Sequence, residues 1–323
     1  MTTTNPFLPF LDRNGTILLD GGLATTLEAA GYSLQDDLWS ARLLLEDPQA
    51  IRGVHEAFLR AGADCIVTAS YQATIAGFRA RGLSESEAEF LLQLSVQLGL
   101  DAREAFVRTR ETSATTSHTD ALAPLVAASI GPYGASLADG SEYHGSYGLT
   151  DGALTRFHEG RWGLLAASRA DLLACETIPS KQEVYVLLEL LRQSASSYAW
   201  LSVTCQDGKH LRDGSALADV FEGADDLDNL VAVGVNCTAP QHVASCIREI
   251  RSVTHKTIIV YPNSGENFDA TQRSWVKGDD TVVDWGVVAR QWLSLGAQGV
   301  GGCCRVGPAE VRAMHQALNP ESS

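Results

Sequence analysis

The sequence predicts a (β/α)8 barrel, and three observations support this fold class. Eight short apolar segments recur along the 323 residues. Each is apolar at nearly every position, which is typical of strands buried on both faces of a parallel sheet. Stretches with helical periodicity separate most of them, and eight β–α units in roughly 300 residues match such a barrel. A doubly wound open sheet is the alternative, but no G-x-G-x-x-G opens the first predicted helix and no G-x-x-x-x-G-K-[ST] occurs.

The first half of the chain supplies four of the predicted strands. Residues 1–15 are expected to be a loose lead-in. The segment TILLDGG at 16–22 is the first strand, because its apolar run ends in Asp20 and two glycines that favour a turn. Asp47 and Pro48 are typical of an N-cap and a first helical position. The other elements predicted here are strands at 64–70, 125–131 and 170–177, and helices at 23–31, 47–62, 84–110 and 153–169.

The second half continues the alternation. Ser180 followed by Glu183 matches the capping-box pattern and predicts the start of a leucine-rich helix. The long segment 131–152 is rich in glycine and tyrosine, and a loop of this length in a compact domain is more often functional than idle. We find no domain boundary, so residues 1–323 are expected to form one barrel domain with a core at about 16–317. Strands are predicted at 198–205, 230–237, 257–265 and 297–304, and helices near 240–250, 284–295 and 308–318.

Composition narrows the class of protein. Lys and Arg total 24 against 39 Asp and Glu, giving a formal charge of −15. Such an acidic surface argues against nucleic acid or an anionic membrane as a partner. No apolar run approaches the roughly 18 to 20 residues of a membrane span, and the first residues lack the features of a secretory signal. The seven cysteines are an odd number and several lie in predicted strands, which favours reduced thiols and a cytoplasmic location.

The carboxyl ends of the strands are the expected site of chemistry. In a (β/α)8 barrel these ends meet at one face, where the active site is built. Cysteines that end the sixth and eighth predicted strands would flank the seventh. The residues expected to converge at this face are Asp20, Ser70, Gly131, Glu176, Cys205, Cys237, Asn263, Cys303 and Cys304.

Cys237, Cys303 and Cys304 are candidate zinc ligands. Three thiolates would leave the fourth tetrahedral position open, and a thiol substrate suits that position. Adjacent strand residues point to opposite faces, so the vicinal pair needs a distorted strand end, for which Gly301 and Gly302 offer backbone freedom. Free cysteines are also common as small buried hydrophobes, and the pattern alone leaves both interpretations open. We expect the buried role for Cys65, Cys175, Cys205 and Cys246.

Seven motifs occur in order along the chain: LLDGGLATTLE, ASYQAT, SIGPYGASLADGSEYHGSY, DLLACET, VGVNC, VYPNSGE and GGCCR. Together they resemble the homocysteine S-methyltransferase family, most closely its S-methylmethionine-dependent branch. The likeness runs from about residue 16 to 317 in the family's order and spacing. It implies a (β/α)8 barrel in which Cys237, Cys303 and Cys304 hold a zinc ion. It also implies transfer of a methyl group from S-methylmethionine to the thiol of homocysteine, giving methionine.

The implied chemistry is physically coherent. A free alkyl thiol has a pKa of roughly 8.5, and only the thiolate is a good nucleophile. Binding to zinc displaces the thiol proton at neutral pH, and three protein thiolates keep the fourth sulfur electron-rich. The family places acidic residues at the positions of Asp20 and Glu176, and we expect both to bind the substrate ammonium group.

The methyl donor carries a sulfonium cation, which aromatic faces attract. Trp39, Tyr71, Tyr133 and Tyr143 are the candidates for this contact, and ordinary packing is the alternative for each. The loop 131–152 is a candidate to close over the donor.

Two asparagines and two histidines are not expected to bind the metal. Asn236 and Asn263 are expected to shape the mouth of the barrel through hydrogen bonds. His55 and His158 lack the second histidine of an H-E-x-x-H motif, and we expect them on solvated helix faces.

Alternative functions stay open at this point. Betaine is also a cationic methyl donor, S-adenosylmethionine is a possible second donor, and selenocysteine or selenohomocysteine would suit the same metal as acceptor. A non-enzymatic zinc or thiol sensor on a barrel scaffold is the alternative from another class, although it leaves the strand-end acids without a role.

Overall fold

Eight parallel strands form one sheet, with the order β1-β10-β7-β6-β5-β4-β3-β2. Leu19 bridges Cys65, and the N–H of Asp20 donates to the carbonyl of Cys65 at 3.0 Å, so the two outer strands meet and the predicted (β/α)8 barrel is confirmed. The computed structural model describes residues 4–33, 39–113, 121–265, 267–269, 274–276 and 283–320. The strands are β1 (Ile17–Leu18), β2 (Cys65–Val67), β3 (Leu125–Ile130), β4 (Leu172–Ile178), β5 (Ala199–Val203), β6 (Leu230–Asn236), β7 (Thr257–Tyr261) and β10 (Gly299–Val300).

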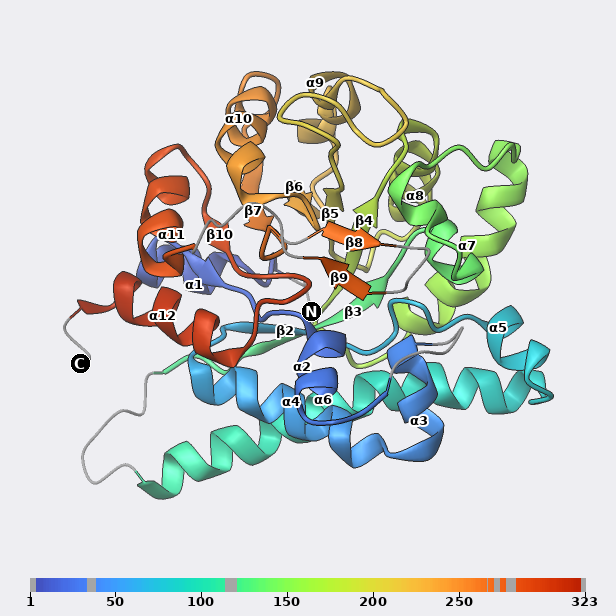
Figure 1. Cartoon of the computed structure of the whole chain (residues 1–323), viewed down its shortest axis with the longest axis horizontal. Coiled ribbons are helices and arrows are strands. Elements are labelled where there is room, and N and C mark those ends of the chain that lie inside the picture. The colour runs from blue at the N-terminus through green and yellow to red at the C-terminus, as the bar shows by residue number, and fades with distance from the viewer. Residues whose placement is uncertain are drawn as a thin grey trace.

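Helices surround the strands, which occupy the centre of the molecule (Figure 1). Two short strands that were not predicted follow β7 in the sequence and precede β10. They are β8 (Asn267–Asp269) and β9 (Ser274–Val276), and they pair with each other in antiparallel fashion. The helices described are α1 (Leu8–Asn14), α2 (Leu23–Ala29), α3 (Leu43–Glu46), α4 (Pro48–Ala61), α5 (Ile75–Ala80), α6 (Glu85–Ser113), α7 (Asp151–Ala166), α8 (Lys181–Gln193), α9 (Leu217–Phe221), α10 (Pro240–Arg251), α11 (Trp285–Ser294) and α12 (Pro308–Leu318).

Two apolar layers follow from strands that are buried on both faces. In β3 every residue is buried, and alternate side chains belong to different clusters. Leu125 and Ala127 pack inside the barrel, whereas Val126 and Ala128 pack between the sheet and the helices. This arrangement explains why the strand segments are apolar throughout.

The lead-in at 1–15 is not loose, and that prediction was wrong. It contains α1, and Phe7 and Phe10 are buried with the interior residues of the barrel. The ring of Phe7 lies 5.9 Å from that of Trp200 on β5. The two phenylalanines pack with the first residues of β3 and β4, so α1 covers the apolar interior at the amino ends of the strands.

The predicted helix starts are confirmed, with one correction. The side chain of Asp47 accepts a hydrogen bond from the N–H of Ala50 at 3.3 Å, and that of Ser180 accepts from the N–H of Glu183 at 3.3 Å. The capping box is incomplete, because the Glu183 carboxylate turns instead to His158 Nε2 at 2.8 Å and does not return to Ser180.

His55 and His158 are fully buried, so their expected placement on solvated faces was wrong. Helical spacing explains the error: His55 lies four residues after Ile51 and three before Phe58, on the buried face of α4. His158 lies on α7 four residues before the buried Trp162. The absence of an H-E-x-x-H motif does not indicate which face of its helix each histidine occupies.

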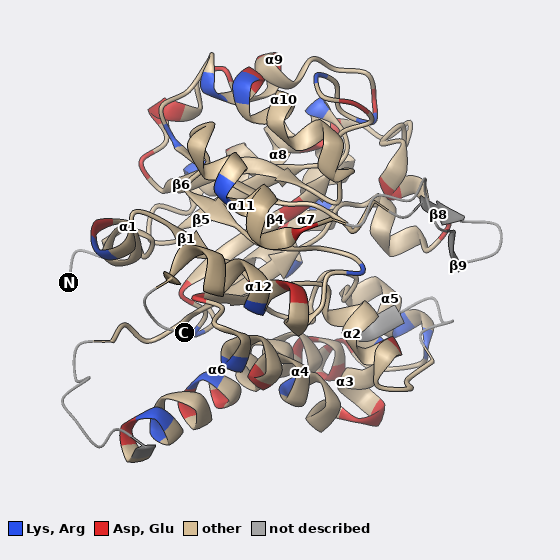
Figure 2. Cartoon of the chain, turned by 60° about the vertical axis from the view of Figure 1, so that its left-hand side comes forward, with Lys and Arg blue, Asp and Glu red and all other residues tan. Residues whose placement is uncertain are grey.

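Charged residues lie mainly on the helices and connecting loops outside the barrel, with both signs interspersed along α6 (Figure 2). Within the described residues, no helix has the length and apolarity needed to cross a membrane.

Candidate active site and metal centre

Three cysteine sulfurs converge at the carboxyl ends of β6 and β10. Cys237 directly follows β6, and β6 and β10 pair with opposite sides of β7. The Sγ atom of Cys237 lies 3.1 Å from that of Cys303 and 3.6 Å from that of Cys304, and all three sulfurs lie within 4.8 Å of one another. Tetrahedral zinc with bonds of about 2.3 Å separates its sulfur ligands by about 3.8 Å, so the donor set and its spacing fit such an ion.

Gly301 and Gly302 precede the vicinal cysteines, and they allow close packing there more than they provide backbone flexibility. A Cβ atom on Gly302 would lie 2.0 Å from Val306, and one on Gly301 would lie 2.7 Å from Leu19. Neither glycine has a positive φ, whereas Cys237 has a φ of 47°. The expected backbone freedom of the two glycines is therefore better described as room for neighbouring chain segments.

Electrostatics within the cluster also fit a bound cation. Hydrogen bonds from Cys303 and Cys304 hold the pKa of Cys237 well below its usual value. The same contacts raise the pKa values of Cys303 and Cys304. The sulfurs by themselves therefore favour one thiolate, and all three can be ionised together only beside a positive charge.

A cavity opens directly onto the three sulfurs. Its lining includes both predicted acids and two of the predicted aromatic residues. The lining residues used below are Asp20, Tyr71, Glu142, Tyr143, Glu176, Thr177, Tyr261, Cys237, Cys303 and Cys304.

Asp20 and Glu176 present buried carboxylates to this cavity. Asp20 Oδ2 accepts a hydrogen bond from the N–H of Val67 at 2.8 Å, and Glu176 Oε1 accepts one from Ser129 Oγ at 2.5 Å. Burial raises the pKa of Asp20 and raises that of Glu176 to about 8, with Cys303 adding to both. Within the described part of the chain, no basic side chain lowers either pKa, so a cationic ligand would complete the site.

Asn236 lies behind the cavity and does not line it. Its Oδ1 accepts hydrogen bonds from the N–H of Thr177 at 2.7 Å and from Ser202 Oγ at 2.9 Å. Its Nδ2 donates to Thr177 Oγ1 at 2.7 Å and lies 3.8 Å from Cys303 Sγ. Asn236 thus links the acidic side of the cavity to the cysteines.

The aromatic candidates separate into distinct environments. Tyr71 and Tyr143 line the cavity. Tyr133 does not: its ring packs 5.1 Å from that of Tyr147 and 5.0 Å from that of Phe157. Trp39 begins the 3-10 helix η1 (Trp39–Arg42), and its side chain lies outside the described part of the structure.

Tyr261 and Glu142 also line the cavity, and neither was predicted. Tyr261 ends β7, and its hydroxyl accepts a hydrogen bond from Trp200 Nε1 at 3.0 Å. A hydrogen bond from Tyr261 also opposes the rise in the pKa of Glu176 that burial causes. The place of Tyr261 at a strand end was a usable signal. Glu142 lies in the loop that the sequence marked as functional, but no pattern singled it out among the polar residues there.

The remaining strand-end candidates serve the frame of the site. Asn263 accepts a hydrogen bond from the N–H of Gly265 at 3.2 Å, and Ser70 donates to the carbonyl of Ser129 at 2.8 Å. Cys205 faces the outer apolar layer and does not line the cavity. The expected burial is confirmed for Cys65, Cys175, Cys205 and Cys246.

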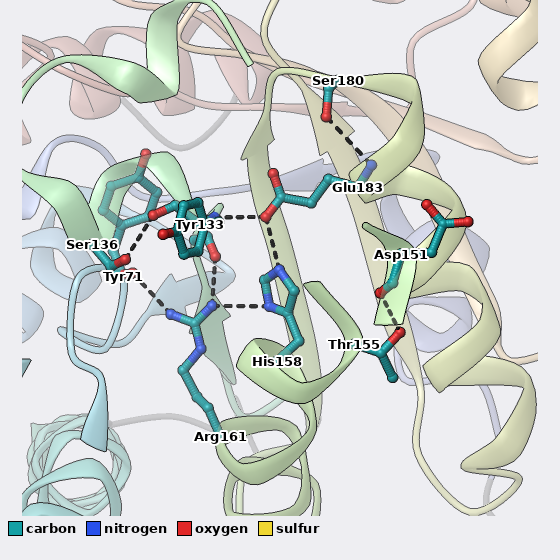
Figure 3. A network of polar contacts seen from close by, with 10 residues as sticks. Tyr71, Tyr133, Ser136, Asp151, Thr155, His158, Arg161, Ser180 and Glu183 are labelled. Atoms are coloured by element: carbon teal, nitrogen blue, oxygen red, sulfur yellow. Dashed lines mark hydrogen bonds and ion pairs between the residues drawn. The ribbon is translucent and has the colours of Figure 1, made fainter. Parts of the chain in front are cut away.

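A buried polar network supports the loop beside the cavity (Figure 3). Arg161 Nη2 donates to the carbonyl of Gly131 at 2.6 Å and contacts His158 Nδ1 at 3.1 Å, and Arg161 Nη1 donates to the carbonyl of Tyr71 at 3.3 Å. Glu183 Oε1 accepts from the N–H of Tyr133 at 2.6 Å. Residues of α7 and α8 therefore fix the start of the loop and the backbone of Tyr71.

Comparison with known proteins assigns this barrel to a family. The family model described as homocysteine S-methyltransferase matches residues 17–318. The chain belongs to the homocysteine S-methyltransferase family. The homocysteine S-methyltransferase YbgG of Bacillus subtilis is 45% identical over 308 residues, covering 95% of this chain and 96% of that protein. The homocysteine S-methyltransferase of Escherichia coli is 43% identical over 314 residues, covering 97% of this chain and 99% of that protein.

Solved structures of the family share the fold. The metallated form of the homocysteine methyltransferase MmuM from Escherichia coli has a TM-score of 0.83 and 42% identity, covering 96% of this chain and 98% of that chain. Its oxidized form has a TM-score of 0.84 and 42% identity, with 97% and 99% covered. The chain is thus a methyltransferase by family, as its motifs predicted.

Proposed function

We propose that this enzyme transfers a methyl group from S-methylmethionine to the thiol of homocysteine, and that zinc bound by Cys237, Cys303 and Cys304 is its cofactor. The observation that carries the proposal is the convergence of three sulfurs on a cavity that also presents Asp20 and Glu176. The chain would act as one barrel domain. Because the cluster requires reduced thiols, we place it in the cytoplasm.

A metal held by Cys237, Cys303 and Cys304 would activate the homocysteine thiol as the nucleophile. A bound zinc ion lowers the pKa of a coordinated thiol and holds its sulfur as thiolate at neutral pH. The donor set supports zinc, since three thiolates are soft ligands that leave one tetrahedral position open. The metallated form of the related Escherichia coli protein supports a metal, without naming which one.

The protein's own residues would orient homocysteine. Asp20 and Glu176 bind its ammonium group. The positive charge compensates the two carboxylates for the hydration they lost on burial, so it favours their ionised forms. Asn236 holds Thr177, the neighbour of Glu176, and so acts as a positioning residue. Two carboxylates beside the cysteines then select an amino-acid thiol over a simple thiol.

The donor would lie on the side of the cavity lined by Tyr71 and Tyr143. Their rings attract the sulfonium, and the buried site excludes water from the reacting methyl group. The homocysteine sulfur forms a bond to the methyl carbon while the donor's carbon–sulfur bond breaks. The electron pair of that bond returns to the donor sulfur, so the neutral thioether of methionine leaves.

A donor comparison tests this function. Zinc-loaded protein is incubated with homocysteine and either S-methylmethionine, S-adenosylmethionine or betaine, and methionine is measured by mass spectrometry. We expect the highest kcat/KM with S-methylmethionine, loss of turnover on chelation, and recovery with added zinc. Turnover that survives complete metal removal would refute the metal's role, and turnover with betaine alone would refute the donor.

A further inference from the structure

The reaction brings two amino acids into one cavity, and both carry an ammonium group. Three carboxylates line the cavity, those of Asp20, Glu142 and Glu176, and none of its described lining residues is a lysine, arginine or histidine. Asp20 and Glu176 are already committed to homocysteine in the proposed function, on which this inference rests. The third carboxylate has no assigned role.

Glu142 is buried without a partner for its charge. It lies in the 3-10 helix η3 (Ser141–Tyr143), and the residue is 8% exposed. Its Oε2 atom is buried and forms no hydrogen bond within the described structure. The charged neighbour that affects its pKa is another carboxylate, Asp139, which adds to the rise caused by burial. A buried carboxylate of this kind needs a cation or a donor from outside the protein.

The loop holds Glu142 firmly in this position. A Cβ atom on Gly134 would lie 2.5 Å from the backbone nitrogen of Glu142, so the two loop segments are in close contact. The N–H of Ser141 donates to Asp139 Oδ1 at 2.9 Å, and Gln72 Nε2 donates to the carbonyl of Ala135 at 3.1 Å. The carboxylate is therefore preorganised, and its burial is a stable feature of the fold.

Glu142 comes from a different element than the two acids assigned to homocysteine. Asp20 follows β1 and Glu176 lies on β4, whereas Glu142 lies in η3, in the loop between β3 and α7, and all three line one cavity. Tyr71 and the three cysteines line the same cavity as Glu142. A donor that carries a sulfonium and, several bonds away, an ammonium finds partners for both charges in this cavity.

We propose that the Glu142 carboxylate binds the ammonium group of the methyl donor and makes the enzyme specific for donors that are amino acids. This contact is remote from the reacting methyl group and is equally strong in the ground state and the transition state. It therefore affects the KM of the donor and leaves kcat nearly unchanged.

The test is the variant Glu142→Gln, which keeps the shape and removes the charge. Steady-state kinetics with S-methylmethionine and homocysteine are measured for the wild type, for this variant and for Glu159→Gln, a matched change at an exposed position on α7. We expect Glu142→Gln to raise the donor KM by about 10- to 100-fold, with the homocysteine KM and kcat unchanged. Glu142→Asp should restore part of the loss, and Glu159→Gln should match the wild type.

Several other results overturn the inference. An unchanged donor KM shows that Glu142 does not bind the donor, and a raised homocysteine KM assigns it to the acceptor. A fall in kcat alone indicates a role in chemistry or folding, which a melting curve distinguishes. If the wild type uses S-adenosylmethionine in place of S-methylmethionine, the proposed donor fails while the same comparison still tests Glu142, because that donor also carries an ammonium. Turnover with betaine alone, which has no amino group, overturns both.

Discussion

Asn236 holds Thr177 by two hydrogen bonds, each 2.7 Å long: its Oδ1 accepts from the Thr177 N–H, and its Nδ2 donates to Thr177 Oγ1. Thr177 has a φ of 61°, a conformation that residues other than glycine rarely adopt. It directly follows Glu176, so the strained residue determines where that carboxylate meets the cavity. The Asn236 amide at the end of β6 thus controls a substrate contact on β4.

Replacing Asn236 by alanine should weaken both stability and homocysteine binding. The variant leaves the buried N–H of Thr177 unpaired, which costs about 1–3 kcal/mol of the free energy of unfolding. It also releases Glu176, so the homocysteine KM rises. Asn229→Ala is the matched control, because Asn229 Nδ2 donates to the carbonyls of Leu191 and Ser197 away from the cavity. Denaturant unfolding should show losses in both variants, and a raised KM in the control would contradict the assignment.

Replacing Cys304 by serine should abolish metal retention and turnover. A serine hydroxyl is a harder and less acidic ligand than a thiol, so the remaining two sulfurs bind zinc weakly. Cys246→Ser removes a buried thiol outside the cluster and should keep about one zinc per chain. Elemental analysis after dialysis measures this directly. Full metal content in Cys304→Ser would remove that residue from the ligand set.

Acid should destabilise the protein through His55. Burial lowers its pKa from 6.5 to about 4, and neither ring nitrogen has a hydrogen-bond partner in the described structure. The folded state therefore disfavours the protonated ring: stability is fully present above pH 6.5 and is lost as the pH falls towards 4. The difference corresponds to about 3 kcal/mol. Between pH 7 and pH 4 the free energy of unfolding should fall less steeply in His55→Leu than in the wild type. Identical slopes in the two proteins would exclude His55 as a cause of acid destabilisation.

Removing Arg161 should unsettle the network that supports the loop. Arg161→Met leaves the carbonyls of Gly131 and Tyr71 without their donor and the buried Glu183 without a nearby cation. Loss of one partner from a buried charged network costs about 3–5 kcal/mol. The double variant Arg161→Met, Glu183→Gln should recover part of this loss. Strict additivity in thermal and denaturant unfolding would mean that the two charges do not interact.

The barrel was predictable because each strand carries its own signal. Burial on both faces makes a segment such as 125–131 apolar throughout, and this can be read without knowing its neighbours. The lead-in lacked such a signal: Phe7 and Phe10 gain their role only from an interior built by distant strands. For His55 the helical period did carry the information, since Ile51 and Phe58 mark the same face.

The sequence by itself determined the alternation of strands and helices, the family and the acids and thiols at the strand ends, because strand order and direction bring those ends to one face. Only the tertiary structure decided the separations between sulfurs and which loop side chains reach the cavity. Tyr133 and Tyr143 belong to one loop, yet one packs against Phe157 and the other lines the cavity. Side-chain direction in a loop has no period, and long-range contacts such as that of Tyr133 with Glu183 decide it.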